Sequence, residues 1–293
     1  MNDDVREMGT ADALGGTDSA APSVLFFDVD GTLVWSDPAE RDVDGDEDFL
    51  DIKPAPGVPE AFARLRERGQ LTFLCTGRPL PLVSQALLDL GFTGIVSGAG
   101  ACVSMGDEIV FETLIDPDVV REMARLVLDL GGTVMFEARE QSVVVSPDDS
   151  NPAIAWFPSI PVAHSVEEME RLAPRMRFGK AATMGGIEWI TDAFTSFIDG
   201  RFTDCFMGFS HEFSPIGVNK GTGVRHVLEH LGRGVEGSFA FGDSENDLPM
   251  FDAVETKIAM ANGLESVKAR ADYVTGHVAH GGIEQALRHF DLI

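Results

Sequence analysis

The chain has 293 residues, which is long enough for about two domains of ordinary size. Hydrophobic residues make up 44% and charged residues 24%, and no apolar run approaches the roughly 18 residues that a membrane span requires. With 22 basic and 48 acidic residues the net charge is −26, so the surface as a whole repels phosphate backbones. These values exclude a membrane-spanning protein and argue against a nucleic-acid binder.

The acidic charge is concentrated at the start of the chain. Residues 1–51 hold 15 Asp or Glu side chains and two arginines, which accounts for half of the net negative charge. The first 22 residues are acidic, rich in small residues and without the basic and apolar regions of a secretion signal, so we expect a disordered tail there. The three cysteines, Cys75, Cys102 and Cys205, match no CxxC spacing and suit a reducing cytoplasm.

From residue 23 onward, short apolar runs alternate with longer amphipathic patterns. We expect strands at 24–28, 71–75 and 94–98, with helices at 57–69 and 80–91 between them. Continuous apolar strands separated by amphipathic helices predict a parallel sheet that is covered on both faces.

The same alternation returns near the C-terminus, and a different texture separates the two parts. The later elements are expected to be helices at 220–231, 245–251, 264–270 and 281–289, and strands at 238–242, 257–261 and 272–274. The intervening segment mixes strands and helices and reads as an inserted α+β domain. The predicted fold class is α/β, with a doubly wound parallel-sheet core at 23–104 and 209–293, an inserted domain at 105–208 and the tail at 1–22.

Polar residues that directly follow different strands of a doubly wound sheet meet at one edge of that sheet. Four such groups stand out in the sequence. They are Asp28 and Asp30 in DVDGTL, Thr76 in CTGRP, Lys220 at the start of a predicted helix, and Asp243, Asn246 and Asp247 in GDSENDLPM.

This set of side chains predicts phosphoryl-transfer chemistry. A few carboxylates at one edge can hold Mg²⁺, a hard cation that keeps several waters and usually also binds substrate phosphate. Asp28 can attack phosphorus to give an aspartyl-phosphate, and Asp30 can protonate the leaving alcohol and later activate water. Lys220 and Thr76 are expected to hold the phosphoryl oxygens.

The four motifs, in this order and spacing, resemble those of the haloacid dehalogenase superfamily of phosphatases, and IAMANGLESVKARADYVT at 258–275 resembles its Cof-type sugar-phosphatase branch. The resemblance covers roughly residues 23–104 and 209–290 and implies that the inserted segment is an α/β cap domain. It implies Asp28 as the nucleophile and Asp30 as the acid/base. The implied phosphate- and substrate-binding residues are Thr76, Gly77, Arg78, Lys220 and Asn246, and the implied metal ligands are Asp28, Asp30, Asp243 and Asp247.

Two features depart from the family pattern. Ala99-Gly100-Ala101 stands where Cof-type proteins commonly carry an Asn-Gly-Ala turn. The stretch from Leu33 to Thr76 is longer than usual and contains the acidic run at 37–51. The expected protein is a cytoplasmic, Mg²⁺-dependent phosphatase of small phosphorylated metabolites, with sugar phosphates first. A phosphomutase-like phosphotransferase, and a non-catalytic protein that binds a metabolite or partner through the same fold, remain the alternatives.

Overall fold

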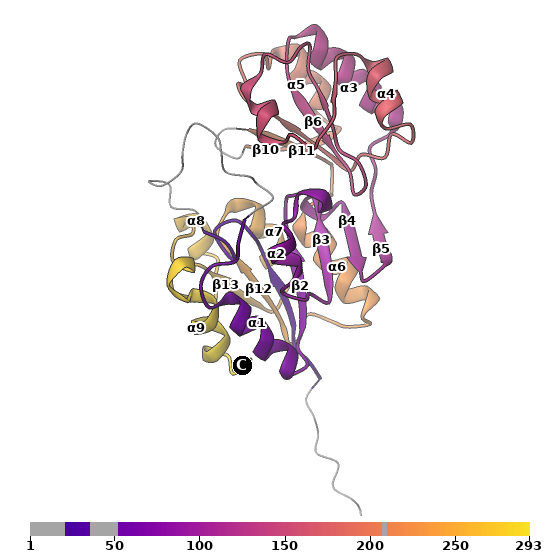
Figure 1. Cartoon of the computed structure of the whole chain (residues 1–293). Coiled ribbons are helices and arrows are strands. Elements are labelled where there is room, and N and C mark those ends of the chain that lie inside the picture. Colours follow the sequence, from indigo (N-terminus) through magenta and orange to yellow (C-terminus); the bar gives the residue numbers. More distant parts are fainter. Residues whose placement is uncertain (1–20, 36–51, 207–209) are drawn as a thin grey trace, which may run out of the picture.

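The computed structural model describes residues 21–35, 52–206 and 210–293, and within these ranges the strands form two sheets (Figure 1). The acidic stretch at 37–51 and nearly all of the expected tail at 1–22 lie outside the described residues. The larger sheet has eight strands, in the spatial order β14 (Tyr273–Val274), β13 (Thr256–Ala259), β12 (Ser238–Gly242), β1 (Val24–Phe27), β2 (Leu71–Cys75), β3 (Gly94–Ser97), β4 (Cys102–Met105) and β5 (Glu108–Glu112).

The larger sheet is parallel from β14 to β3, and β4 and β5 extend it as antiparallel strands. Strand β1 lies at its centre and is buried on both faces. Leu25 and Phe27 belong to the apolar cluster on one face, whereas Val24 and Phe26 belong to the cluster on the other. This alternation explains why β1 reads as a continuous apolar run, and the doubly wound α/β class predicted from it is confirmed.

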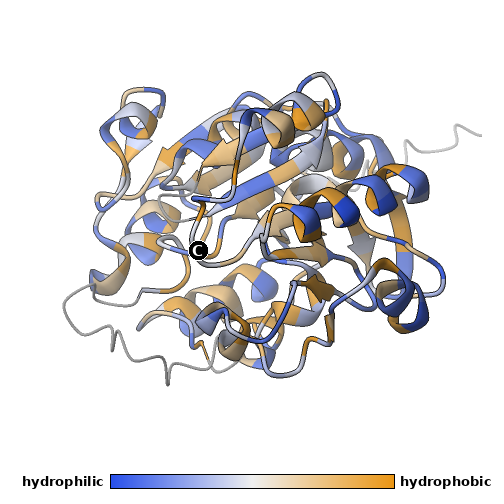
Figure 2. Ribbon diagram, turned by 90° about the horizontal axis from the view of Figure 1, so that it is seen from above, coloured by the Kyte–Doolittle hydropathy of each residue, from blue (hydrophilic) through white to orange (hydrophobic). Residues whose placement is uncertain are grey.

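Helices cover both faces of this sheet. Helices α1 (Val58–Glu67) and α9 (Gly282–His289) pack together on the side of Leu25, and α6 (Lys220–His230) and α7 (Leu248–Phe251) pack together on the side of Val24. In Figure 2 the helices carry both hydrophilic and hydrophobic residues, as expected for helices that cover a sheet with one side only. Two further helices, α2 (Gln85–Leu88) and α8 (Glu265–Lys268), are as short as α7.

The prediction of one continuous helix at 80–91 is wrong, because the segment is interrupted. The chain forms a 3-10 turn at Leu80–Leu82, becomes extended at Val83 and Ser84, and then starts α2. Ser84 causes the interruption, because its hydroxyl oxygen accepts a hydrogen bond from the backbone N–H of Leu87 and its hydroxyl donates to the backbone oxygen of Ile52. A serine that caps a new helix cannot also continue the preceding one.

The smaller sheet lies beside the larger one, and its helices cover the side that faces away from the larger sheet (Figure 1). Its strands, in spatial order, are β10 (Phe202–Phe206), β11 (His211–Pro215), β9 (Lys180–Thr183), β6 (Val134–Glu137), β7 (Val143–Val145) and β8 (Val162–Ala163). Its helices are α3 (Pro117–Asp129), α4 (Val166–Leu172) and α5 (Asp192–Ile198). We call residues 113–215, which connect and form this sheet, the cap.

The sheets define where the chain crosses from one layer to the other. Strand β5 belongs to the larger sheet and β11 to the smaller one, so both crossings come later than the predicted boundaries at 104/105 and 208/209. The division into two folding domains stays a prediction. No helix in the described ranges has both the length and the apolar character needed to cross a membrane.

Candidate active site

The candidate site forms where three neighbouring parallel strands end. Strands β1, β2 and β12 lead directly into Asp28, Thr76 and Asp243, and these three strands are adjacent in the sheet. Asp28 and Thr76 are buried, although both are polar. The edge therefore brings together residues that are more than 200 positions apart in the sequence, as the strand-end argument predicts.

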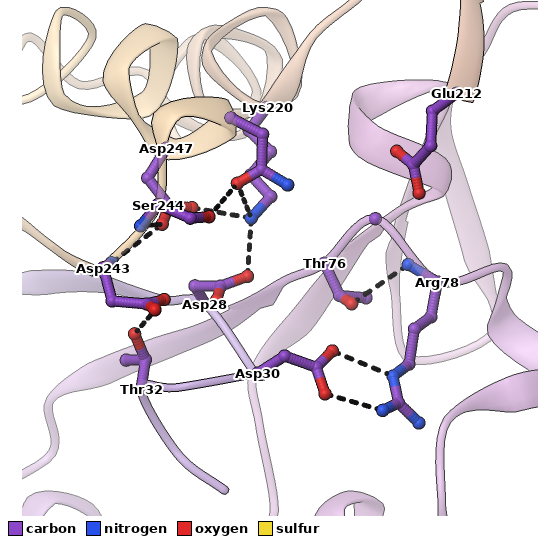
Figure 3. Close-up of polar contacts among 12 residues, drawn as sticks. Asp28, Asp30, Thr32, Thr76, Arg78, Glu212, Lys220, Asp243, Ser244 and Asp247 are labelled. Carbon is purple, nitrogen blue, oxygen red and sulfur yellow. Dashed lines mark hydrogen bonds and ion pairs between the residues drawn. The ribbon is translucent and has the colours of Figure 1, made fainter. Parts of the chain in front are cut away.

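Lys220 lies at the centre of this group (Figure 3). It is the first residue of α6, and its side chain is only 1% exposed. Its Nζ lies 2.5 Å from Asp28 Oδ1, 2.6 Å from Asp247 Oδ1 and 3.2 Å from Asn246 Oδ1. An ammonium has three protons to donate, so all three are used by acceptors within the site.

The loop after β12 is held by its own side chains. Asp247 Oδ2 accepts hydrogen bonds from the backbone N–H groups of Asp243 and Ser244, at 2.9 and 3.1 Å. Asn246 Oδ1 also accepts from the Ser244 hydroxyl at 2.7 Å. Both oxygens of Asp247 are thus already occupied by donors, and its main effect is to fix the loop and Lys220. Asn246, which we predicted to bind phosphate, accepts a hydrogen bond from Lys220 in this structure.

The charges in the site shift the pKa values of its members. Burial, with repulsion from Asp247, raises the pKa of Asp28 well above its usual value, although Lys220 opposes this. The same two causes raise the pKa of Asp243 to about 7. Burial alone would lower the pKa of Lys220, but attraction to Asp247 and Asp28 outweighs it and holds that pKa well above its ordinary value. The site therefore has more negative charge than its one buried lysine balances.

The carboxylates of Asp28, Asp243 and Asp247 can converge on one cation. Each offers an oxygen within 4.8 Å of the others, and the set contains only hard oxygen donors, which Mg²⁺ prefers. A divalent cation would favour the ionised forms that burial and repulsion disfavour, so the residues fit the predicted metal. Gly31 lies directly against Asp243. Its φ of +86° favours glycine, and a Cβ built on it would come within 2.3 Å of Asp243 Oδ2, so no larger residue fits there.

Asp30 was predicted to be a metal ligand, but its carboxylate lies apart from those of Asp28, Asp243 and Asp247. Its carboxylate forms a bidentate pair with Arg78, with Oδ1 2.7 Å from Nη2 and Oδ2 3.1 Å from Nε. The Asp30 side chain is 60% exposed and, as Figure 3 shows, faces Arg78 rather than Asp243. The guanidinium fork matches a carboxylate at two points, which explains why Asp30 is held on this side of the site.

Thr76, Gly77 and Arg78 form a tight loop after β2. Thr76 Oγ1 accepts a hydrogen bond from the backbone N–H of Arg78 at 3.1 Å. The loop is also fixed to the turn after β3, since the Ala99 N–H donates to the Thr76 carbonyl and the Gly98 N–H donates to that of Arg78. Because Thr76 Oγ1 already accepts one hydrogen bond, its hydroxyl proton is available to an anion at the sheet edge.

The structure adds three residues that the motifs did not indicate. Asn262 donates to the Gly31 carbonyl at 2.8 Å and accepts from Val278 N–H at 3.0 Å, which supports the turn after β1. It follows β13, so the strand-end rule could have found it. Lys180 and Glu212 come from the cap sheet and reach the loop around Gly77. Lys180 is the one charged residue in the strand KAAT, whereas Glu212 follows His211 in the mixed strand HEFSP and has no such signal.

The family match spans both sheets of the structure. Residues 25–287 match the haloacid dehalogenase-like hydrolase family, and the chain belongs to it. A candidate phosphatase of Bacillus subtilis, YkrA, is 24% identical over 279 residues, which cover 92% of this chain and 98% of that protein. A phosphoglycolate phosphatase of Methanothermobacter thermautotrophicus is 40% identical over 84 residues, 28% of this chain and 38% of that one.

Solved structures agree with this assignment over nearly the full length. The sugar phosphatase BT4131, described as subclass IIB of the superfamily, has a TM-score of 0.74 and 25% identity, covering 92% of this chain and 100% of that one. The protein TM0651 of Thermotoga maritima has the same fold, with a TM-score of 0.74 at 20% identity over 92% of this chain and 97% of that one. The family predicted from the motifs, its Cof-type branch and the enzyme class, a phosphatase, are confirmed.

Proposed function

We propose that the protein is a Mg²⁺-dependent phosphatase of small phosphorylated metabolites, with sugar phosphates as its first substrate class. The observation that carries this proposal is the convergence of Asp28, Asp243 and Lys220 at one edge of the larger sheet. Thr76, which directly follows β2, is buried at the same edge. Such a site has anionic groups for a cation and cationic and hydroxyl groups for a phosphoryl group. The sugar-phosphate class is supported by the likeness to BT4131, which is named a sugar phosphatase.

In the proposed reaction Asp28 is the nucleophile. Its Oδ1 accepts a hydrogen bond from Lys220, and Oδ2 is the oxygen that would form the bond to phosphorus. The bond between phosphorus and the leaving oxygen breaks, and the alcohol takes a proton from Asp30. Water then attacks the aspartyl-phosphate with Asp30 as base, which releases inorganic phosphate and restores both carboxyl groups.

The proposed acid/base role requires Asp30 to move. In this structure both of its oxygens are bound to Arg78, and a carboxylate held by a guanidinium is not ready to donate a proton. Asp30 is exposed, so it can turn from Arg78 toward Asp28 when a substrate enters and take up from solvent the proton that it then gives to the leaving alcohol. We infer that Arg78 holds Asp30 between turnovers and then becomes available to the phosphoryl group.

Asp28, Asp243 and Asp247 are the proposed metal-site carboxylates, because each offers an oxygen within 4.8 Å of the others. Asp247 also fixes Lys220 and the loop after β12. When bound, Mg²⁺ neutralises charge on the phosphoryl oxygens and orients them. Thr76 would donate its hydroxyl proton to a phosphoryl oxygen, and Lys220 would stabilise the same group electrostatically. A cytoplasmic location remains a prediction, consistent with the buried free thiols of Cys75 and Cys102.

The test is release of inorganic phosphate from a panel of sugar, nucleotide and small-acid phosphates in the presence of Mg²⁺. Asp28→Asn should abolish release and EDTA should do the same, whereas Asp252→Asn, which changes an exposed carboxylate paired with Arg270, should leave activity unchanged. Asp30→Asn should lower kcat by about 10²- to 10⁴-fold, as expected for loss of an acid/base.

Other outcomes would favour the alternatives. An isomerised sugar phosphate without free phosphate would indicate a phosphomutase-like transfer. A folded protein that binds a metabolite but converts none of the panel would indicate a non-catalytic role. Retained turnover in Asp28→Asn would overturn the proposed nucleophile.

A further inference from the structure

Lys180 is a cap residue whose ammonium reaches the active-site loop of the larger sheet. It begins β9 and its side chain is only 1% exposed. Its Nζ lies 2.8 Å from the Gly77 carbonyl oxygen, 2.8 Å from Glu212 Oε1 and 3.2 Å from Glu137 Oε2. A single side chain thus connects two cap strands with the loop between Thr76 and Arg78.

The surroundings of Lys180 hold it as a charged and oriented group. Burial by itself would lower the pKa of Lys180, but attraction to Glu137 and Glu212 outweighs it and raises that pKa. Lys180 donates a hydrogen bond to the Gly77 carbonyl oxygen and forms ion pairs with the two carboxylates. Glu137 Oε2 accepts no hydrogen bond in the described part of the chain, so its charge is compensated through the ion pair with Lys180.

The contact with Gly77 bears on the orientation of Thr76. The carbonyl of Gly77 and the N–H of Arg78 belong to one planar trans peptide and point in opposite directions. With the carbonyl directed at Lys180, the N–H is directed at Thr76 Oγ1, which lies 3.1 Å away. A cation on the carbonyl also polarises the peptide and strengthens the N–H as a donor. The Thr76 hydroxyl is therefore left to donate toward the sheet edge.

The backbone beside Lys180 is fitted closely to the larger sheet. A Cβ built on Gly179 would lie 2.9 Å from Ala101 Cβ and 3.2 Å from the Thr113 carbonyl oxygen. Glu212 lies over the same loop, with both carboxylate oxygens 3.5 Å from a Cβ built on Gly77 (Figure 3). The cap thus approaches the Thr76–Arg78 loop through Lys180 on β9 and Glu212 on β11.

We propose that Lys180 is a positioning residue that, from the cap, sets the orientation of the Thr76–Arg78 loop for phosphate. The loop then has its full affinity for a phosphoryl group only while Glu137 and Glu212 hold Lys180 against Gly77. This couples docking of the cap to phosphate binding without placing a cap residue on the phosphate itself. The inference rests on the proposed function, because it assigns the phosphate to this loop.

The test compares inorganic phosphate binding in matched variants. Lys180→Met alone would leave two buried carboxylates unpaired and can unfold the cap, so the main variant combines Lys180→Met with Glu137→Gln and Glu212→Gln. The control is Arg139→Met, which removes a different cap-to-core ion pair, with Glu112 on β5, and does not contact the loop. Urea unfolding and near-UV circular dichroism establish that each variant is folded.

We expect the triple variant to bind inorganic phosphate, in the presence of Mg²⁺, about 10- to 100-fold more weakly by calorimetry, the range for loss of a hydrogen bond to a charged group. For two phosphate esters with different leaving groups, kcat/KM should fall by similar factors. The Arg139→Met variant should match the wild type within about twofold in phosphate affinity, since Arg139 pairs with Glu112 and Glu140 and not with the Thr76–Arg78 loop.

Wild-type phosphate affinity in the folded triple variant would overturn the inference. So would a loss confined to one ester, because that result would make Lys180 a leaving-group contact. If the wild type binds phosphate but hydrolyses no ester, the phosphatase proposal fails, and the comparison of phosphate affinities still decides the role of Lys180. If the wild type binds no phosphate with Mg²⁺ present, the loop has no phosphate for Lys180 to affect, and the inference is overturned.

Discussion

Lys220 shows how a single buried cation can hold a site of opposite charge together. It lies between Asp28 and Asp247 at 2.5 and 2.6 Å, and none of the three side chains has appreciable access to water. Burying such a group is unfavourable unless every charge has a partner. Removing the cation is therefore expected to affect both the stability of the fold and the affinity for phosphate.

Replacement of Lys220 by Met should lower the free energy of unfolding by about 3–5 kcal/mol, the usual effect of breaking a buried ion pair. It should also weaken binding of inorganic phosphate, because the phosphoryl oxygens lose a nearby cation. Urea titration and calorimetry measure the two effects. Adding Asp247→Asn should recover part of the stability and none of the phosphate affinity; wild-type affinity in Lys220→Met would assign the phosphate contact to another residue.

Glu137 is expected to make stability depend on pH. Burial raises its pKa from 4.5 to about 7 in the folded protein, so the folded state binds this proton more tightly than the unfolded chain does. The stabilisation from a raised pKa is complete below the unfolded pKa, near 4.5, and is lost as pH rises through the folded value near 7. Between these limits the loss is on the order of 3 kcal/mol.

The variant Glu137→Gln has no such proton and isolates this effect. Urea unfolding of both proteins at pH 5 and pH 7.5 should show the wild type losing stability relative to Glu137→Gln as pH rises, by on the order of 3 kcal/mol. Contributions from Asp28 and Asp243 cancel in the comparison. A difference that is the same at both pH values would rule out Glu137 as the titrating group.

At the scale of elements, the start of α6 determines where Lys220 lies. Asn219 is the N-cap of this helix, and its Oδ1 accepts a hydrogen bond from the Thr222 N–H at 3.0 Å. Asn219→Ala should lower the free energy of unfolding by about 1 kcal/mol, whereas Asn219→Asp, which retains a capping oxygen, should stay close to the wild type. Thermal or urea unfolding distinguishes the two. Equal destabilisation by both substitutions would mean that the amide group, and not the cap, matters at this position.

The sequence could predict the elements whose signals are local. Asp28, Thr76 and Asp243 were placed correctly at one edge because each directly follows an apolar strand and the parallel arrangement then brings them together. The helix at 80–91 was wrong because the apolar spacing of Leu80, Val83 and Leu87 suits one helix, while the hydroxyl of Ser84 starts another.

Contacts between the cap and the larger sheet could not be predicted from local sequence patterns. Lys180 meets Gly77 across 103 positions, and nothing in the sequence near either residue indicates the other. The pairing of Asp30 with Arg78 was missed for a related reason. Residues that follow strands can be predicted to share one edge of the sheet. Which cation a carboxylate there binds depends on side-chain geometry, and the sequence spacing does not give that geometry.

At the scale of the whole molecule, the two sheets are connected by polar contacts around the site. Lys180 reaches Gly77, and Arg139 and Arg177 of the cap both pair with Glu112 on β5 of the larger sheet. Such interfaces between parts of one chain resemble transient protein interfaces, for which relative motion is the usual expectation. A cap that docks through ion pairs can separate to admit a substrate and close again over the site.

The net charge of −26 predicts how the whole fold responds to salt. Salt screens both the favourable surface ion pairs and the general repulsion among excess carboxylates. Exposed pairs contribute about 0–1 kcal/mol each and many contribute nothing, whereas the excess charge acts on the entire compact state. Repulsion should therefore dominate, and screening should stabilise the protein. Half of the excess lies in residues 52–293, so the effect does not depend on the acidic start of the chain alone.

Raising KCl from 10 to 200 mM at pH 8, with EDTA present, should increase Tm by a few degrees, which corresponds to about 1 kcal/mol for a chain of this size. The Debye length falls from about 30 Å to below 10 Å over this range, so repulsion between distant carboxylates is largely removed. At pH 5, close to the isoelectric point near 4.4, the same salt step should have a smaller effect because the net charge is lower. Scanning calorimetry measures both; a Tm that falls with salt at pH 8 would mean that specific ion pairs, such as those between the cap and the core, outweigh the repulsion.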